Sequence, residues 1–432
     1  MKLIYNNLDL QIEIGKGSDT TSDIIFFQDP ASKEYIQIEN SLKHQPKGIR
    51  TLATVLGIKK TTKSDFTFIT LNKPCNAAAV LTRCACPSYT ILRNREILKD
   101  GKIQAIAVNS GNANVFTPTG NEDLKEIARL LATEFNIAEN DILISSTGVI
   151  GVSLPMDKFR NGIPGIKTKL EENNLGAASQ AILTTDAGPK TASINHNGIQ
   201  ISGIAKGAGM IEPNLATMLV YLFTNIKITS KQLQEALEFA VDDSFNAISI
   251  DSDTSTSDTV CLLSTEEREC TDSQFTTFKI ALRALCVKLA RDIVSQGEGV
   301  TKIIEASVET EVSLEFSKKL AKKIINSPLV KAAVHGADPN WGRVVAALGK
   351  PDDFSKTISV FPEEQIEIML CDELVFSKKQ STNFDLKAIS KKIKDNKFTQ
   401  IAVKIGNGGY LSRVWGSDLT EEYVTFNSDY TS

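Results

Sequence analysis

A glycine-containing loop runs directly into an apolar segment at residues 206–219, which read KGAGMIEPNLATML. Its two glycines permit close approach of the backbone, and Pro213-Asn214 is typical of a turn. The apolar run at 218–223 has the length of a buried strand. Thr217 therefore stands between a tight loop and a strand, an arrangement that is common by itself.

Strand-like and helical patterns alternate on both sides of this segment, which predicts a mixed α/β fold. We expect a turn at 145–148, and a helix that has Ser230 as its N-cap and carries Leu233 to Val241. Further strands are expected at 103–108, 142–144, 303–308, 357–361 and 366–371, and further helices at 122–135, 275–293 and 317–326.

The length of the chain predicts more than one domain, because 432 residues exceed the usual size of one hydrophobic core. We predict a catalytic domain at 46–304 and a smaller C-terminal α/β domain at 305–432. Residues 1–45 have no strong periodicity and are interpreted as an N-terminal appendage.

The composition disfavours several classes of protein. Apolar residues make up 41% and charged residues 23%, which is ordinary for a globular protein. A formal charge of -4 without a Lys/Arg-rich block argues against a nucleic-acid partner. No apolar stretch reaches the roughly 18 residues that a membrane span needs, and the acidic first forty residues do not resemble a targeting peptide. We therefore expect a cytoplasmic protein with no membrane partner and with reduced cysteines.

Histidine and metal chemistry find little support. There are three histidines, of which His44 and His196 lie in polar, surface-like segments. His335 begins the stretch HGADPNWGR (335–343), which suits a rigid turn and a site equally well. The acidic segment 251–258 lacks the glycine and terminal glutamate of a calcium loop, so no metal site is expected. No nucleophile elbow, Walker A loop or dinucleotide motif is present.

An enzyme with few histidines and no metal needs another general base. An N-terminal threonine supplies one, because its α-amine, with a pKa of about 7.7–8.0, can take the hydroxyl proton. An internal threonine reaches that state only if the peptide bond before it is cut. The segment 206–219 suits such a cut, although the pattern alone does not decide it.

The same segment closely resembles the self-cleavage motif of the ornithine acetyltransferase family, also called bifunctional glutamate N-acetyltransferase. The resemblance extends from about residue 46 to the C-terminus. The other matching motifs, in family order, are NSGNAN at 109–114, STGVIG at 146–151, TTD at 184–186 with PK at 189–190, GEG at 297–299 with TK at 301–302, GADPNWGR at 336–343, and WG at 415–416 with DLT at 418–420.

This resemblance implies a helix-sheet-sheet-helix sandwich of the self-cleaving aminopeptidase and ornithine acetyltransferase type. It implies cleavage between Ala216 and Thr217, which gives an α-chain of residues 1–216 and a β-chain of residues 217–432 in an α2β2 heterotetramer. Thr217 would accept the acetyl group of N-acetylornithine and pass it to glutamate by a ping-pong mechanism, a step of arginine biosynthesis.

The resemblance also implies roles for individual residues. Thr147 and Gly148 match the oxyanion hole, and Lys206 matches a lysine that holds the substrate α-carboxylate. Glu298 would pair with the ornithine side-chain ammonium. The remaining substrate contacts match Thr184, Thr185, Asn427 and Ser432. No cofactor or metal is implied; some members use acetyl-CoA as a second donor, and the sequence leaves this open.

Several positions depart from the family pattern, namely Glu212, Ser252, Ser257 and Ser417. None of them is a predicted nucleophile, oxyanion or lysine position, but they leave the acceptor open. The alternatives are a paralogue that acetylates another amine, a self-cleaving aminopeptidase or amidase, and an uncleaved structural paralogue.

Overall fold

The computed structural model describes residues 24–28, 35–212, 218–351 and 363–429. These residues form two compact units, which are described separately. The larger unit ends at residue 293 and lacks 247–253, which belong with 294–429 to the smaller unit. The predicted domain limit at 304/305 thus lies inside a strand of the smaller unit, β13 (Ile303–Thr310).

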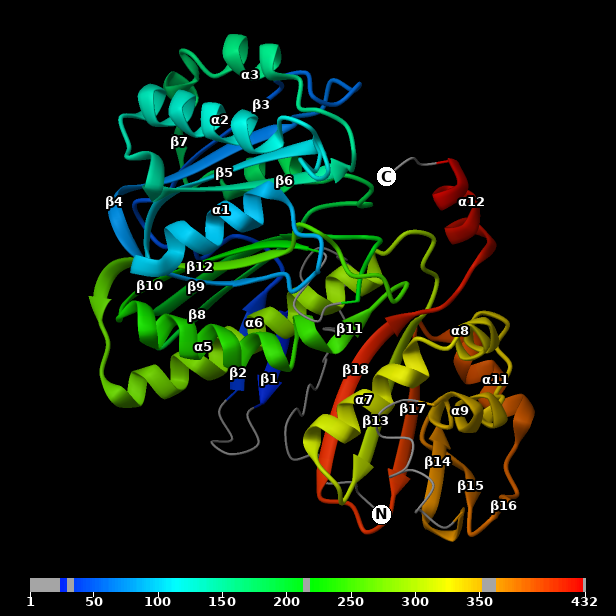
Figure 1. Ribbon diagram of the computed structural model, residues 1–432. Helices are drawn as coiled ribbons and strands as arrows, with labels where there is room; N and C mark the ends of the chain where they lie inside the picture. The colour runs from blue at the N-terminus through cyan, green and yellow to red at the C-terminus, as the bar shows by residue number, and fades with distance from the viewer. Residues whose placement is uncertain (1–23, 29–34, 213–217, 352–362, 430–432) are drawn as a thin grey trace. The chain divides into compact units, whose positions relative to one another are not determined.

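Two layers of β-sheet form the centre of the larger unit (Figure 1). They share the long strand β4 (Phe66–Leu81), whose first half pairs with β3 and β5 and whose second half pairs with β12. The pairs β5–β6 and β10–β12 are parallel, and the other pairs are antiparallel. The first layer also contains β3 (Arg50–Thr54), β5 (Lys102–Asn112), β6 (Ile142–Val149) and β7 (Glu171–Glu172). The second contains β1 (Ile24–Gln28), β2 (Tyr35–Glu39), β8 (Lys190–His196), β9 (Ile199–Lys206), β10 (Leu219–Lys227) and β12 (Thr259–Glu269).

Helices cover the outer faces of both layers (Figure 1). The first layer carries α2 (Gly120–Phe135) and α3 (Met156–Gly162), and the second carries α5 (Ser230–Asp242) and α6 (Asp272–Ser295), whereas α1 (Tyr89–Ile97) contacts β6 and α2. This helix-sheet-sheet-helix order confirms the predicted α/β sandwich. The remaining helices are α4 (Leu175–Ala181) and the single turns η1 (Leu98–Asp100), η2 (Glu139–Asp141), η3 (Ile166–Lys169) and η4 (Phe245–Ala247).

Strand β5 shows why the layers stack in this way. Successive side chains of a strand point to opposite faces. Ala105 and Ala107 pack in the cluster that contains the α2 residues, whereas Ile106 and Val108 pack in the cluster that contains Tyr221 of β10. Because both faces of β5 are buried, its sequence is a nearly continuous apolar run.

Strand β2 belongs to the second layer although its residues lie inside the predicted appendage. Ile36 and Ile38 are fully buried, and Glu39 pairs with Ser193 of β8. A five-residue alternation is a weak signal at the level of sequence, and its burial depends on the neighbouring strand.

The smaller unit is built on a second sheet, in the order β11-β18-β13-β17-β14-β15-β16 (Figure 1). The helix α7 (Leu314–Ile325) packs on β13 and β18. The other strands are β11 (Ile248–Ser249), β14 (Ile366–Leu370), β15 (Glu373–Ser377), β16 (Gln380–Ser381), β17 (Phe398–Ile405) and β18 (Tyr410–Ser417). The other helices are α8 (Pro328–His335), α9 (Trp341–Leu348), η5 (Glu363–Gln365), α11 (Leu386–Asp395) and α12 (Glu421–Asp429).

Two local predictions are wrong. The expected turn at 145–148 is part of β6, because its pairing with β5 continues to Val149. The N-cap of α5 is Thr229, whose side chain accepts from Gln232 N, rather than Ser230. The predicted strand at 357–361 lies outside the described residues.

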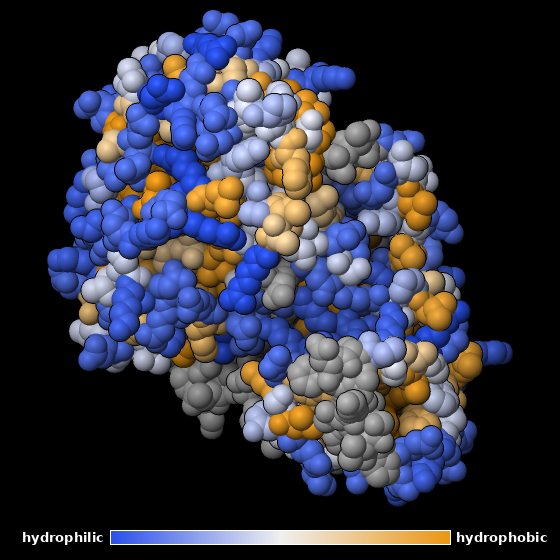
Figure 2. Space-filling view, in the orientation of Figure 1, coloured by the Kyte–Doolittle hydropathy of each residue, from blue (hydrophilic) through white to orange (hydrophobic). Residues whose placement is uncertain are grey.

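None of the helices in the described ranges is long and apolar enough to cross a membrane. On the face shown in Figure 2, both units are mostly hydrophilic, with hydrophobic residues in small groups.

Candidate functional site

The predicted site residues fall into two groups. Thr147, Gly148, Thr184, Thr185 and Lys206 belong to the larger unit, and Glu298 and Asn427 belong to the smaller one. The predicted nucleophile Thr217, its neighbour Ala216 and the terminal Ser432 lie outside the described residues.

Lys206 and Thr147 are in direct contact although they lie 59 positions apart in the chain. Lys206 is the last residue of β9, and its Nζ donates to Thr147 Oγ1 at 3.1 Å. An ammonium group can only donate, so the Thr147 hydroxyl oxygen is the acceptor. The hydroxyl hydrogen of Thr147 therefore remains for another acceptor.

Gly148 stands where the ends of β5 and β6 come closest. A Cβ at this position would lie 2.4 Å from the backbone carbon of Gly111, and the φ of Gly148 is +132°. Both the contact and the left-handed region of φ exclude other residues. The position requires glycine, and it places the backbone of Gly148 next to the Thr147 side chain.

A buried carboxylate, that of Asp186, interacts electrostatically with Lys206. Asp186 accepts from Lys190 Nζ at 2.7 Å and from the backbone N–H of Gly207 at 2.6 Å. The side chains of Asp186 and Lys190 are fully buried. Burial acts to raise the pKa of Asp186, but Lys206, Lys190 and the hydrogen bonds outweigh it and lower that pKa to about 2.

Thr184 and Thr185 lie on the segment that ends at Asp186. The backbone N–H of Thr184 donates to Asp186 Oδ2 at 3.1 Å, and both threonines are half-buried. Asp186 thus connects the Thr184–Thr185 segment to the loop that begins at Gly207. One carboxylate therefore holds the backbone of Thr184 and of Gly207, the residue that follows Lys206.

A third lysine, Lys59, lies in the same region. Lys59 donates to Leu183 O at 2.7 Å, and burial lowers the pKa of Lys59, with a smaller contribution from Lys206. The loop that carries Lys59 is held by Asp65, whose carboxylate accepts four backbone N–H groups of residues 56–59. Several lysine side chains therefore lie in this region, and their positive charges would attract a substrate carboxylate.

The asparagine motif at 109–114 forms a buried network beside Gly148. Ser146 Oγ donates to Asn109 Oδ1 at 2.6 Å, and Asn109 Nδ2 donates to Asn112 O at 2.9 Å. Asn114 Nδ2 donates to Gly120 O at 2.9 Å. These amides satisfy backbone groups in the loop after β5, so their evident role is to fix that loop.

In the smaller unit, the two predicted substrate residues meet. Asn427 Nδ2 donates to Glu298 Oε2 at 3.0 Å, and Glu298 is 9% exposed. Tyr423 lies on the same helix, and its hydroxyl donates to Asp251 Oδ2 at 3.2 Å. Burial, followed by the charges of Asp251 and Glu298, raises the pKa of Tyr423. This anionic surrounding suits a substrate ammonium.

The start of α12 is fixed against the segment that follows Glu298. Gly299 has a φ of +65°, and a Cβ there would lie 2.4 Å from Tyr423 N. Thr420 Oγ1 donates to Gly299 O at 2.8 Å. The nearby Asp418 accepts the backbone N–H groups of Thr301 and Lys302, both at 3.0 Å. Hydrogen bonds therefore join the motif at 297–302 directly to the motif at 415–420.

His335 contacts the second of these motifs. Its Nδ1 lies 3.2 Å from Asp418 Oδ2, and the stretch that it begins joins α8 to α9, with Asn340 as the N-cap of α9. The turn interpretation of residues 335–343 accounts for these contacts.

Sequence reasoning did not single out Asp186, Lys190, Lys59 or Asp65, and it considered Asp258 only as part of the acidic segment 251–258, where no metal site was expected. Asp186 and Lys190 stood inside quoted motifs, which is the one signal that pointed to them. Their pairing with Gly207 and Thr184 depends on strand register, which the motifs do not contain.

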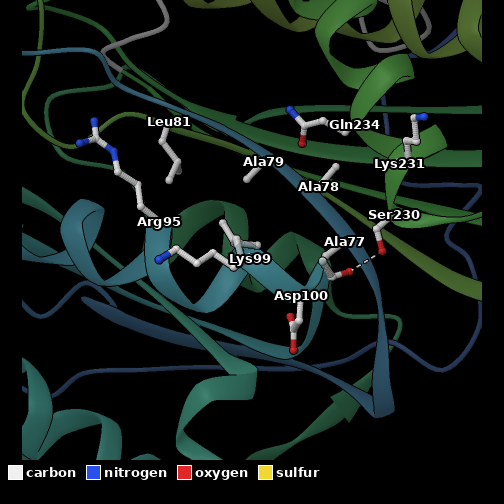
Figure 3. A pocket seen from close by; sticks show the side chains of 12 residues that line it. Ala77, Ala78, Ala79, Leu81, Arg95, Lys99, Asp100, Ser230, Lys231 and Gln234 are labelled. Atoms are coloured by element: carbon white, nitrogen blue, oxygen red, sulfur yellow. Dashed lines mark hydrogen bonds between the residues drawn. The ribbon is translucent and has the colours of Figure 1, made fainter.

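A cavity of about 480 Å³ lies elsewhere in the larger unit, between α1–η1 and the start of α5 (Figure 3). Residues Ala77–Ala79 of β4 form its floor, and Arg95, Lys99 and Lys231 stand around it. Ser230 Oγ donates to Gly101 O at 2.8 Å across one side. No predicted site residue lines this cavity.

Comparison with known proteins identifies the family. The profile of the ArgJ family matches residues 50–432. The chain is 42% identical over 389 residues to "Arginine biosynthesis bifunctional protein ArgJ 2" of Clostridium acetobutylicum, covering 89% of this chain and 98% of the relative. It is 41% identical over 393 residues to the protein of the same name from a Nostoc species, covering 90% and 98%.

Two solved structures are also similar in part. The ArgJ protein of Bacillus halodurans is 31% identical, with a TM-score of 0.44, and the match covers 50% of this chain and 100% of that one. The ornithine acetyltransferase of Mycobacterium tuberculosis, solved with ornithine, is 32% identical, with a TM-score of 0.38, covering 40% and 94%. The extent of the profile match and the identity to relatives of nearly equal length confirm the resemblance inferred from the motifs: this chain belongs to the ArgJ family.

Proposed function

We propose that this protein transfers an acetyl group from N-acetylornithine to glutamate through an acetyl ester on Thr217. Its relatives are named as bifunctional proteins of arginine biosynthesis, and one solved neighbour is named as an ornithine acetyltransferase bound to ornithine. The observation that carries the proposal is the Lys206–Thr147 contact of 3.1 Å. It brings together a position that matches the oxyanion hole and a position that matches substrate binding, at the end of the strand that leads toward Thr217.

The nucleophile arises by cleavage of the bond between Ala216 and Thr217. The new α-amine of Thr217 has an ordinary pKa of about 7.7–8.0, close enough to neutral pH that a fraction of it is unprotonated and can accept a proton. In the first half-reaction it takes the hydroxyl proton while Thr217 Oγ attacks the acetyl carbonyl. The proton then passes to the departing amine of ornithine, which leaves an acetyl ester on Thr217.

In the second half-reaction the amine of glutamate attacks that ester. The α-amine takes the proton that the attacking nitrogen loses and returns it to the Thr217 oxygen. N-acetylglutamate and free threonine result, so one amide-to-amide exchange is divided into two easier steps.

Thr147 and Gly148 stabilise the oxyanion that forms in both half-reactions. Because Lys206 donates to Thr147 Oγ1, the Thr147 hydroxyl hydrogen is free to point at the oxyanion. The nearby ammonium polarises this hydroxyl further. A backbone N–H at Gly148 would be the second donor, in a role typically worth about 3–4 kcal/mol per donor.

The substrates are recognised by their charges. Lys206, with Thr184 and Thr185 beside it, binds the α-carboxylate in the cationic region of the larger unit. Glu298, oriented by Asn427, binds the side-chain ammonium of ornithine in the smaller unit. Ser432 is proposed as a further substrate contact.

Further aspects follow from the same proposal. No cofactor takes part, because Thr217 itself carries the acetyl group; acetyl-CoA serves as a second donor for glutamate.

The α-chain (1–216) and β-chain (217–432) remain together as an α2β2 heterotetramer in the cytoplasm. The catalytic domain is assigned to 46–304 and the smaller domain to 305–432. The names of the relatives favour acetyl transfer over the aminopeptidase or amidase alternative.

The test combines a denaturing gel with product analysis. The native chain should yield two fragments of similar size and, with N-acetylornithine and glutamate, equal amounts of ornithine and N-acetylglutamate. Thr217→Ala should give one band of 47.1 kDa and no products. Thr168→Ala, at an exposed threonine, is the matched control and should behave as native. Acetyl transfer by the Thr217→Ala variant would disprove the nucleophile, and release of free acetate without acetylated glutamate would favour a hydrolase.

A further inference from the structure

Asp258 is a buried acid, 3% exposed, that directly precedes β12, the strand between β10 and β4. Its carbonyl oxygen accepts the Thr82 N–H at 3.0 Å. The next residue, Thr259, donates its N–H to Met218 O at 3.0 Å. The Asp258 carboxyl accepts the backbone N–H of Met218. Residues 258 and 259 therefore bind both backbone polar groups of Met218.

The second carboxyl oxygen has a different surrounding. Among the residues that the structure describes, Asp258 Oδ2 is buried and has no hydrogen-bond partner. An ionised carboxylate in such a position would lose most of its solvation without compensation. Burial raises the pKa of Asp258 well above its ordinary value, and this outweighs the opposing effects of the Met218 N–H and the Lys206 ammonium.

Met218 is the residue directly after the proposed nucleophile. A planar peptide bond joins Met218 N to the carbonyl carbon of Thr217, so a group that holds the Met218 N–H also restrains the peptide of Thr217. Small displacements of a reacting group are costly: about 1 Å can lower a rate on the order of 10²-fold.

We propose that Asp258 is a positioning residue for cleavage and acetyl transfer, and that it acts as a neutral carboxylic acid bound to the Met218 N–H. This inference rests on the proposed function of Thr217. It goes beyond the roles that the family resemblance implies, because none of those roles belongs to Asp258.

Neutrality matters because of the base that the reaction needs. Asp258 is bound to Met218, the residue that follows Thr217, and a negative charge on Asp258 would favour the protonated form of the Thr217 α-amine and raise its pKa. The amine would then be unable to accept the hydroxyl proton. A neutral acid supplies the same hydrogen-bond acceptor without this charge.

Two substitutions distinguish the effect of the Asp258 hydrogen bond on position from the effect of a charge on Asp258. Asp258→Leu removes the acceptor and should slow cleavage and lower kcat on the order of 10²-fold, with little change in KM. Asp258→Asn keeps a neutral acceptor and should rescue cleavage and kcat, with the native pH profile of kcat/KM. Thr51→Val is the matched control, because it removes a buried hydroxyl from β3, which pairs with β4 and β7 rather than with β10 or β12. It should cleave and turn over as native.

Amide exchange tests the contact without using activity. In the uncleaved Thr217→Ala background, Asp258→Leu should speed exchange of the Met218 N–H by about fivefold, since a lost hydrogen bond is worth about 1 kcal/mol. Unchanged exchange would show that the carboxyl does not hold Met218 and would overturn the inference.

The kinetic outcomes are equally decisive. Normal cleavage and kcat in Asp258→Leu, or a loss of thermal stability alone, would reduce Asp258 to a structural residue. A folded Asp258→Asn variant as inactive as Asp258→Leu would show that the ionised form is required. If the native chain itself neither cleaves nor transfers acetyl groups, the proposed function fails, while the exchange measurement still decides whether Asp258 anchors Met218.

Discussion

The carboxylate of Asp186 accepts the backbone N–H of Gly207 at 2.6 Å. Gly207 is the first residue after β9 and begins the loop that leads toward Thr217, whereas Asp186 follows the Thr184–Thr185 segment. The bond therefore connects two predicted substrate-binding segments. The negative charge of Asp186 shortens its bond to Gly207. Lys190, which is fully buried beside Asp186, neutralises that charge.

Asp186→Asn should destabilise the larger unit by about 3–5 kcal/mol, because it leaves the Lys190 ammonium buried without its counter-charge. Urea denaturation followed by fluorescence measures the change. The matched control is Asp157→Asn, which breaks an ion pair with Arg160 in which the aspartate side chain is 88% exposed. That loss should be less than about 1 kcal/mol. Equal effects of the two substitutions would contradict the buried pair.

The stability contributed by Asp186 should depend on pH in a defined direction. Its pKa in the folded protein is about 2, below the roughly 3.9 of an unfolded aspartate. The contribution is complete above the unfolded pKa and is lost as the pH falls toward 2, because in this range the unfolded state binds the proton more readily than the native state does. Unfolding free energies of the native protein and Asp186→Asn should converge between about pH 4 and pH 2. A constant difference over this range would refute the assignment.

Thr147→Val should lower kcat by about 10²–10³-fold with little change in KM, because an oxyanion donor acts chiefly in the transition state. Steady-state kinetics with N-acetylornithine and glutamate give both constants. Thr147→Ser keeps the hydroxyl and serves as the control, with kcat much closer to native. A variant whose KM rises while kcat stays unchanged would place Thr147 in ground-state binding instead.

Gly148→Ala should prevent correct assembly of the first sheet layer. The added Cβ would lie 2.4 Å from the backbone of Gly111, and no flexible side chain can move away to relieve this contact. Circular dichroism melting and solubility report the effect. Gly176→Ala, where a Cβ meets nothing within 4 Å, should be neutral. A stable and active Gly148→Ala protein would mean that β5 and β6 do not approach as described.

Glu298→Gln should raise the KM for N-acetylornithine and leave self-cleavage intact, because it removes a charge partner of the substrate but no group that acts on residues 216–217. Asn427 can still donate to the glutamine oxygen, so the local structure is kept. Glu315→Gln, at an exposed glutamate of the same unit, is the control and should be silent. Loss of cleavage in Glu298→Gln would assign this carboxylate to the chemistry rather than to recognition.

The elements of the fold followed well from local patterns where apolar runs were long. The strand at 103–108 and the helix at 122–135 were expected and are present as parts of β5 and α2. The turn expected at 145–148 was wrong, because Ser-Thr-Gly favours turns locally while parallel pairing with β5 keeps these residues extended. β2 was missed for a related reason: its five residues are a strand because they pair with β1 and, at Glu39, with β8.

The sequence by itself determined the family, the α/β class and the residue types at the candidate site, because motifs and periodicities are local and survive in the order of the chain. Only the tertiary structure decided that Lys206 contacts Thr147, that Asp186 holds Gly207, and that Asp258 binds Met218. Each of these contacts joins segments at least 21 residues apart. Their geometry follows from strand register and burial, which are properties of the assembled sheets rather than of any one segment.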